Sequence, residues 1–179
     1  MLGEHITLED KTFRLYITET EIMTAVSNIA ETINADYIGK RPIIIPILNG
    51  SFMFASDLAK RLTIDCEFSF IKASSYKGSE STGILTSLIG VNEEIEGRDI
   101  ILVEDIIDTG HTLAKIMPSI LSLFPASVKI ATLLFKPNAL KTELKIDYIG
   151  MQIPNEFIVG YGLDYNGLGR NLREIYQVV

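Results

Sequence analysis

The chain has 179 residues, of which 47% are hydrophobic, and its formal net charge is −7. A chain of this length suits one domain and buries roughly 70% of the surface that it exposes when unfolded, while 13 glycines and 6 prolines exclude a collagen-like or low-complexity chain. The 23 acidic residues outnumber the 16 basic ones. This excess excludes a globally basic surface but not a local basic patch, so we expect neither nucleic acid nor a membrane as a partner.

The sequence shows no pattern typical of a targeting or membrane-spanning segment. The first residues, MLGEHITLEDK, lack a basic stretch followed by an apolar one, and the longest apolar runs are far shorter than the ~20 residues that span a bilayer. The single cysteine, Cys66, excludes an intramolecular disulfide and a zinc site of several thiolates, and its alternating apolar neighbours predict a buried strand position. We therefore expect a soluble, cytoplasmic protein.

The first predicted helix covers residues 20–35. Four apolar residues recur there at a helical spacing and form one stripe, namely Ile22, Val26, Ile29 and Ile33. Thr18 or Thr20 can cap the first turn, and Glu19 and Glu21 suit the positive end of the helix dipole.

A strand and a turn follow this helix. Residues 41–48 are apolar almost throughout, which predicts a strand buried on both faces. Asn49-Gly50-Ser51 predicts a turn, and Ser51 opens a predicted helix that ends at Leu62. After a second strand over 64–72, the small polar residues of 73–83 predict a long loop, which is either a lid over a site or a solvated hairpin connection.

The second half of the sequence alternates strands with a helix over residues 112–124, which Pro118 is expected to kink or delay. The helix residues expected to face inward are Leu113, Ile116, Ile120 and Phe124. Strands are predicted over 84–91, 99–103, 128–135, 148–152, 157–161 and 175–178. Buried strands that alternate with helices predict an α/β fold with a mostly parallel central sheet flanked by helices.

Residues 100–112, with the sequence Ile-Ile-Leu-Val-Glu-Asp-Ile-Ile-Asp-Thr-Gly-His-Thr, form the most informative motif. The predicted strand delivers Glu104 and Asp105 at its carboxyl end, where ligands bind in open α/β sheets. The turn after it leads into a helix N-terminus. The N–H groups and threonine hydroxyls of residues 109–112 therefore form a phosphate cradle, and Gly110 lets a ligand come close to the backbone.

Three carboxylates, those of Glu104, Asp105 and Asp108, lie beside this cradle in the sequence and would repel a bare anion. A ligand that carries a phosphate, vicinal hydroxyl groups and a bound divalent cation resolves the conflict. Two other interpretations stay open. The Asp-Thr-Gly triplet also occurs in aspartic proteases, which need an all-β chain, and a capped helix can follow an acidic turn without any site.

The motif of residues 100–112 resembles the signature of the type I phosphoribosyltransferases. Four further stretches resemble, in matching order, elements of the hypoxanthine-guanine phosphoribosyltransferases. These are the pyrophosphate loop (47–58), the mobile lid (74–83), the strand end that presents a lysine to the purine (133–136) and the hood over the base (153–172). The resemblance spans roughly residues 40 to 178.

This resemblance implies a single phosphoribosyltransferase domain over residues 1–179 with the type I fold. Its small hood would be formed by the N-terminal segment and about residues 150–179. The implied reaction belongs to purine salvage: hypoxanthine or guanine and phosphoribosyl diphosphate give IMP or GMP and pyrophosphate, with Mg²⁺ as cofactor. The resemblance also implies a homodimer or homotetramer. Two alternatives remain, namely a xanthine-preferring transferase and a regulator of the same fold that binds nucleotide and RNA.

By the same resemblance, two residues carry the chemistry. Asp108 would exchange a proton with N7 of the purine, and Lys136 would donate to O6 and so reject 6-amino purines. The implied purine-binding residues are Lys136, Phe157, Ile158 and Asp164. Those implied for the ribose and the 5′-phosphate are Glu104, Asp105, Asp108, Thr109, Gly110, His111 and Thr112.

The remaining implied roles concern the diphosphate. Pyrophosphate would be held by Leu48, Asn49, Gly50 and Arg170, magnesium by Asp164, Glu104 and Asp105, and the lid would be formed by Ser75 and Tyr76. The sequence departs from the family at Asn49 and at His111, where a lysine is common. We expect a cis peptide between Leu48 and Asn49 and a solvent-facing His111.

Overall fold

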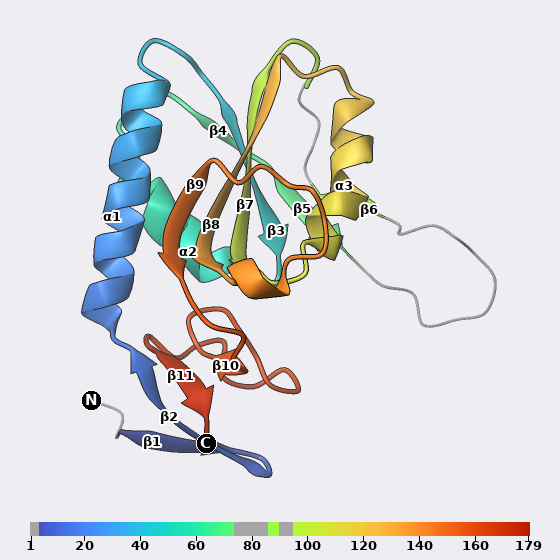
Figure 1. Cartoon of the computed structure of the whole chain (residues 1–179). Helices are drawn as coiled ribbons and strands as arrows, with labels where there is room; N and C mark the ends of the chain where they lie inside the picture. Colours follow the sequence, from blue (N-terminus) through green and yellow to red (C-terminus); the bar gives the residue numbers. More distant parts are fainter. Residues whose placement is uncertain (1–3, 74–85, 90–94) are drawn as a thin grey trace, which may run out of the picture.

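The computed structural model describes residues 4–73, 86–89 and 95–179, and it contains two β-sheets, a central sheet above a smaller one in Figure 1. The central sheet has the order β6-β5-β3-β7-β8-β9, and β4 also pairs with β3. All of these pairs are parallel except β5 with β6. Its strands are β3 (Ile43–Leu48), β4 (Glu67–Phe68), β5 (Phe70–Ala73), β6 (Thr86–Ile89), β7 (Asp99–Ile107), β8 (Ser127–Phe135) and β9 (Tyr148–Gln152).

Helices cover both faces of the central sheet, which confirms the predicted α/β class. On one face, α1 (Glu19–Asp36) and α2 (Phe52–Ala59) pack against a cluster that includes Ile101 and Val103 of β7. On the other face, α3 (His111–Leu121) packs against a cluster that includes Ile100 and Leu102. Alternate residues of one strand thus enter two cores, which is why β7 is apolar without alternation.

The smaller sheet joins the two ends of the chain. It is antiparallel, has the order β1-β2-β11-β10, and consists of β1 (His5–Leu8), β2 (Lys11–Ile17), β10 (Ile158–Val159) and β11 (Ile175–Val178). We call this sheet, together with the connecting residues 160–174, the hood. It has its own small core, in which Phe13, Val159 and Tyr176 are fully buried.

Several predicted boundaries move in the structure. The strand expected over 64–72 is divided into β4 and β5, the strand expected over 99–103 runs on to Ile107, and β10 is shorter than 157–161. The sequence patterns did not predict β1 and β2 as strands. Strand β6 confirms part of the strand expected over 84–91. The loop expected over 73–83 lies, apart from its first residue, outside the described residues.

Two helix predictions were wrong in detail. Helix α2 begins directly after Ser51, as predicted, but it ends at Ala59 and not at Leu62. The buried Ser51 hydroxyl makes no cap bond to the helix, because it donates to the carbonyl oxygen of Ile47 at 2.6 Å. Helix α3 begins at His111 without delay and ends at Leu121, so Phe124 lies beyond it, is 74% exposed and does not face the core. Pro118 lies at an exposed position within α3.

Cys66 is only partly buried and lies one residue before β4, where it packs against the core on the α1 side of the sheet. The predicted contact with the core is confirmed, but its place within a strand was wrong. Within the described residues, no helix is long and apolar enough to cross a membrane.

The connection from strand β2 of the hood to helix α1 is stabilised by a helix cap. Thr18 follows β2 directly, and its hydroxyl accepts the N–H of Glu21 at 3.3 Å, while the Glu21 carboxylate accepts the N–H of Thr18 at 2.9 Å. This capping box satisfies two N–H groups that the first turn would leave unpaired. Of the two predicted caps, the structure selects Thr18.

We expect Thr18→Ala to lower the free energy of unfolding by about 1 kcal/mol, because the cap is lost. The control Thr20→Ala lies inside the first turn of α1 and should change it by less than about 0.5 kcal/mol, because exposed helix positions tolerate alanine. Urea unfolding followed by circular dichroism measures both values. An equal loss in the two variants would contradict the assignment of the cap.

Candidate active site

The carboxyl ends of β3, β7 and β8 meet at one edge of the central sheet. Ile107 is paired with Phe135 in the parallel register of β7 and β8, so the next residues, Asp108 and Lys136, leave the sheet side by side. The Nζ atom of Lys136 lies 3.2 Å from Oδ2 of Asp108. The lysine side chain is 8% exposed and the aspartate side chain 43%, so the ammonium group is held inside while the carboxylate faces outward.

The turn from β7 to α3 encloses a hollow of about 230 Å³. The residues that line it are Glu104, Ile106, Ile107, Asp108, Thr109, Gly110, His111, Thr112 and Leu113. Gly110 has a φ of +79° and no side chain that caps α3. The N–H groups in the first turn of any helix have no partner within the helix, and no side chain of Gly110 covers them here. They form the positive end of the helix dipole, which attracts an anion. We call this the loop hollow.

Gly110 is tightly enclosed from behind. A Cβ at this position would lie 2.1 Å from Oγ1 of Thr142, whose hydroxyl donates to the carbonyl oxygen of Thr109 at 3.3 Å. Lys141 also donates its backbone N–H to that carbonyl oxygen at 3.1 Å. Sequence reasoning did not single out Thr142, because its partner is 33 residues away in the chain.

A second hollow, of about 320 Å³, lies next to the first and shares Ile106 and Asp108 with it. We call it the hood hollow, since it is closed by hood residues on one side. It is lined by Gly50, Asp105, Ile106, Asp108, Lys136, Phe157, Ile158, Leu163, Asp164 and Arg170. Eight of these ten residues are among those predicted from the sequence. They include Gly50, expected in the pyrophosphate loop, and Asp108, expected for the ribose and the proton transfer. Ile106 and Leu163 were not predicted, because apolar residues carry no chemical signal.

The adjacent carboxylates Glu104 and Asp105 enter different hollows, because successive side chains of a strand point to opposite sides. Burial raises the pKa of Glu104 well above its ordinary value, and the charge of Asp105 adds to this rise. Oε2 of Glu104 is buried and has no hydrogen-bond partner among the residues that the structure describes. Burial also raises the pKa of Asp105 to about 6, although its carboxylate accepts the N–H of Ile106 at 2.9 Å.

Asp105 is packed against the loop that follows β3. A Cβ on Gly50 would lie 1.9 Å from Oδ2 of Asp105, and a Cβ on Gly162 of the hood would lie 2.0 Å from the carbonyl oxygen of Gly50. A Cβ would overlap other atoms at both positions, so the backbones of Gly50 and Gly162 are in direct contact and the Asp105 carboxylate packs against Gly50. The Leu48–Asn49 peptide that precedes this contact is cis, as expected, and Asn49 is exposed.

Asp164 and Arg170 hold each other within the hood hollow. The guanidinium Nη2 forms an ion pair with Oδ1 of Asp164, and Nη1 donates to the carbonyl oxygen of Gly162 at 2.7 Å. Oδ2 of Asp164 accepts the N–H of Gly167 at 2.7 Å. The cation and the carboxylate expected for pyrophosphate and magnesium are thus adjacent, and both influence the charge state of Asp105.

Phe157 presents an aromatic surface to the hood hollow and is 46% exposed. Its ring meets Tyr165 edge-on at 5.8 Å between centroids and Phe13 at 6.2 Å. The hydroxyl of Tyr165 donates to Asp10 in the turn between β1 and β2 at 2.7 Å. The N-terminal hairpin therefore supports the ring from behind, and the structure leaves one side of it exposed.

The structure does not bring all expected residues into one cluster. Within residues 4–73, 86–89 and 95–179, no group of three or more histidine, cysteine, aspartate or glutamate side chains lies close enough to hold a metal ion alone. The expected set Asp164, Glu104 and Asp105 is divided between the two hollows. His111 is exposed as expected. The lid residues Ser75 and Tyr76 lie outside the described residues.

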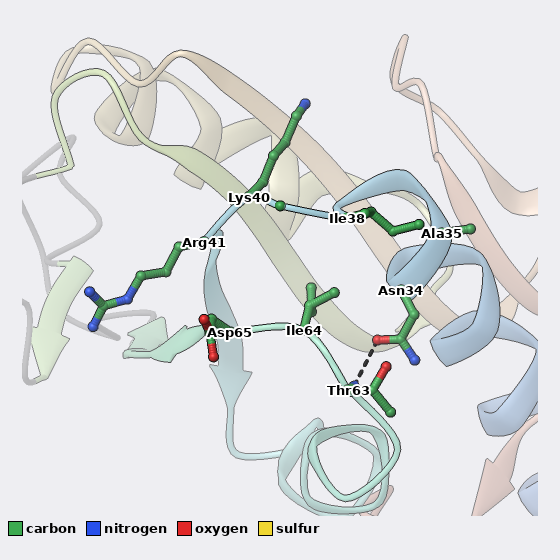
Figure 2. A pocket seen from close by; sticks show the side chains of 9 residues that line it. Asn34, Ala35, Ile38, Lys40, Arg41, Thr63, Ile64 and Asp65 are labelled. Carbon is green, nitrogen blue, oxygen red and sulfur yellow. Dashed lines mark hydrogen bonds between the residues drawn. The ribbon is translucent and has the colours of Figure 1, made fainter.

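A separate hollow lies near the amino ends of the strands, away from these residues. Its lining includes Asn34, Lys40, Arg41 and Thr63. Figure 2 shows that Lys40 and Arg41 point away from each other, while Asn34 accepts the backbone N–H of Thr63 at 2.9 Å. These polar groups converge on no common point, so the two hollows at the carboxyl ends of the strands form the candidate active site.

Comparison with known proteins agrees with this geometry. A model of the phosphoribosyl transferase domain matches residues 16–166. The chain belongs to the phosphoribosyltransferase family. It is 42% identical to a hypoxanthine-guanine phosphoribosyltransferase of Streptococcus pneumoniae over 166 residues, which is 92% of each chain. It is 42% identical to one of Lactococcus lactis, over 89% of this chain and 87% of the relative.

Solved phosphoribosyltransferase structures have the same fold. A crystal structure of a hypoxanthine-guanine phosphoribosyltransferase from Bacillus anthracis superimposes with a TM-score of 0.84 at 38% identity and covers 92% of this chain and 96% of that one. The hypoxanthine phosphoribosyl transferase of Trypanosoma cruzi gives 0.85 at 32% identity, over 97% and 95% of the two chains. The predicted family and the type I phosphoribosyltransferase fold are therefore confirmed.

The raised pKa of Asp105 predicts a pH-dependent stability cost. Its ionisation destabilises the folded state: the cost is absent below the ordinary pKa of 3.8, grows between pH 4 and 6, and is complete above about 6. At pH 7.5, Asp105→Asn should therefore raise the free energy of unfolding by about 1–3 kcal/mol, and at pH 4 this gain should shrink toward zero. Thermal unfolding at the two pH values measures it, and a variant less stable than the parent at pH 7.5 would contradict the prediction.

The contact between Gly50 and Asp105 predicts that Gly50→Ala abolishes activity. The new methyl group would overlap a buried carboxylate, and a displacement of about 1 Å in a site costs roughly 100-fold in rate. Gly39→Ala is the control, since a Cβ there meets no atom within 4 Å. It should retain phosphoribosyl transfer and lose only about 1–2 kcal/mol of stability to its positive φ. Comparable transfer rates for the two variants would refute the packing argument.

Proposed function

We propose that this phosphoribosyltransferase acts in purine salvage, and that it converts hypoxanthine or guanine and phosphoribosyl diphosphate to IMP or GMP and pyrophosphate. The observation that carries the proposal is the buried Lys136 beside Asp108, in a hollow that also holds the exposed ring of Phe157. The adjoining loop hollow ends at a helix N-terminus. A base site and an anion site thus lie next to each other, as a nucleoside monophosphate requires.

The purine is recognised through its 6-oxo group. The Lys136 ammonium donates to O6, and the amino group of adenine offers it no comparable acceptor. Phe157 stacks on the ring face, and Ile158 lines the same hollow beside the base edge. The low exposure of Lys136 strengthens this discrimination, because the 6-amino group of adenine would place a second donor against the buried ammonium group and could not accept its hydrogen bond.

The sugar phosphate is held at the other end of the site. The N–H groups of residues 109–112 and the hydroxyls of Thr109 and Thr112 bind the 5′-phosphate. The carboxylates of Glu104 and Asp105 accept hydrogen bonds from the ribose hydroxyls. Oε2 of Glu104, which is buried without a partner in the described part of the chain, gains one in this way.

The reaction exchanges two bonds at C1 of the ribose. The bond to the diphosphate oxygen breaks, and its electron pair leaves with pyrophosphate, which Arg170 and the N–H groups of the loop at Gly50 neutralise. N9 of the base attacks the cation-like C1, and the proton on N7 passes to the carboxylate of Asp108. Lys136 holds the base through O6 while this happens, so the ring nitrogen and C1 are aligned. The lid residues Ser75 and Tyr76 belong to this proposal as the groups that exclude water.

The carboxylates present fit a magnesium ion that is shared with the substrate. Asp105 and Asp164 line the same hollow and supply the hard oxygen ligands that Mg²⁺ prefers, and Glu104 lies one residue away on the other side of β7. Asp105 and Asp164 would hold the ion together with oxygen atoms of the substrate. Bound Mg²⁺ neutralises the leaving oxygens.

The resemblance to the hypoxanthine-guanine phosphoribosyltransferases supports a homodimer or homotetramer. The structure of the Trypanosoma cruzi relative was determined to study the role of its C-terminal region in oligomeric state and enzymatic activity. In this chain, the C-terminal strand β11 lies inside the sheet of the hood, between β2 and β10.

The base preference tests the proposal. With phosphoribosyl diphosphate and Mg²⁺, we expect product from hypoxanthine and guanine, and a kcat/KM for adenine lower by about 10⁴-fold, because a site built around one hydrogen bond rejects an analogue that cannot accept it. Chelation of Mg²⁺ should stop the reaction. Xanthine as the best substrate would favour a xanthine-preferring transferase. Salt-dependent RNA binding without product would indicate a regulator, and adenine as the best substrate would contradict the role of Lys136.

The role of Asp108 has its own test. Asp108→Asn should lower kcat for hypoxanthine by about 100-fold or more, since general acid–base groups contribute 10²–10⁴-fold, and should leave the KM for phosphoribosyl diphosphate within about threefold. Asp65→Asn, an exposed position at the opposite end of the sheet, is the control and should behave like the parent. Near-normal turnover of Asp108→Asn would remove the proton-transfer role.

A further inference from the structure

Tyr161 occupies an unusual position in the hood. Its side chain is 2% exposed and belongs to the core between α1, α2 and the central sheet, although the residue lies in the hood connection. Its φ is +48°, and both flanking residues, Gly160 and Gly162, also have positive φ. A left-handed conformation costs a non-glycine residue roughly 1–2 kcal/mol. The surrounding contacts must therefore fix this tyrosine in place.

The hydroxyl of Tyr161 makes the decisive contact. It donates to Oδ2 of Asp57 in the middle of α2 at 2.8 Å. Asp57 is itself held, because its Oδ1 accepts from Lys60 at 2.9 Å and its carbonyl oxygen accepts from Arg61 at 2.9 Å. Arg61 also donates to Ser27 of α1 at 3.0 Å. The hood is thereby anchored to both helices on this face of the central sheet.

Helix α2 begins directly after the loop that contains Gly50. One residue after Tyr161, Gly162 rests on the carbonyl oxygen of Gly50 so closely that a Cβ would lie at 2.0 Å. Gly162 also accepts from Arg170 at 2.7 Å and donates to the carbonyl oxygen of Arg170 at 2.9 Å. The Tyr161–Asp57 bond therefore ties together the two segments that carry Gly50 and Arg170.

We propose that Tyr161 is a positioning residue for the pyrophosphate end of the site, and that it acts through its hydrogen bond to Asp57. The inference rests on the proposed function, since that function assigns pyrophosphate to Gly50 and Arg170. Tyr161 is not among the residues that line the hood hollow, and its hydroxyl group is hydrogen-bonded to Asp57 of α2. Its effect falls on the diphosphate and not on the purine, because Lys136 and Asp108 are fixed by the separate pairing of β7 with β8.

Tyr161→Phe tests the inference, because it removes only the hydroxyl group. We expect pyrophosphate in the presence of Mg²⁺ to bind about tenfold more weakly in calorimetry, and KM for phosphoribosyl diphosphate to rise by a similar factor. KM for hypoxanthine should stay within twofold. The matched control is Tyr176→Phe, which removes another buried tyrosine hydroxyl that donates to a carboxylate of the hood, Glu174, at 2.8 Å. This control should leave all three values within twofold.

Asp57 supplies an independent pair of variants in case Tyr161→Phe does not fold. Asp57→Asn keeps an oxygen that accepts from Tyr161 and should retain pyrophosphate binding within about threefold. Asp57→Ala leaves the buried hydroxyl unpaired and should weaken binding at least tenfold. Rescue by asparagine is the result that a role of the Asp57 charge would not produce.

The outcomes separate this inference from the proposed function. Unchanged pyrophosphate binding in Tyr161→Phe and Asp57→Ala, or an equal rise of both KM values, overturns the positioning role. A parent protein that binds pyrophosphate but converts none of the 6-oxopurines overturns the proposed function, while the ratio of pyrophosphate affinities still decides the role of Tyr161. A parent that does not bind pyrophosphate overturns both.

Discussion

The parallel pairing of β3, β7 and β8 is the constraint on which the site depends. Parallel strands end at the same edge, so residues that are far apart in the chain, such as Asp108 and Lys136, emerge side by side. The pairing is stabilised by two apolar cores, one on each face, and both use residues of β7. Because those cores hold the strands in one register, the ends of the strands have no freedom to separate.

The site places charge where the fold would favour apolar groups. Glu104 and Asp105 continue a strand that is otherwise apolar, and burial raises the pKa of both. Such groups cost stability in the unliganded protein and gain partners when hydroxyl groups or a cation arrive. The net charge of −7 is consistent with the phosphate-rich substrate of the proposed function, in which backbone N–H groups, Arg170 and a metal ion would meet the phosphates locally.

The hood turns an open sheet edge into an enclosed site. Its two halves come from the two ends of the chain and are joined by strand pairing between β2 and β11. Side chains add further links, since Tyr165 donates to Asp10 and Asn166 donates to Glu9. These contacts support Phe157 from behind, while Tyr161 ties the same segment to α2. The part of the hood that supports Phe157 and the part that carries Tyr161 are thus fixed by different contacts.

The sequence by itself determined the α/β class, the approximate place of most central strands along the chain, the carboxylates of residues 104–108 and the lysine at position 136, because strand burial and a turn before a helix are written in local patterns. The tertiary structure decided what depends on distant partners. Strand β2 pairs with β11 from the other end of the chain and β1 pairs with β2, while Phe124 lost its expected core position because α3 ends three residues earlier. The backbone contact of Gly50 with Gly162 and the bond from Tyr161 to Asp57 join positions more than 100 residues apart. No periodicity reports such pairs, since they exist only once the sheet register and the hood have brought the segments together.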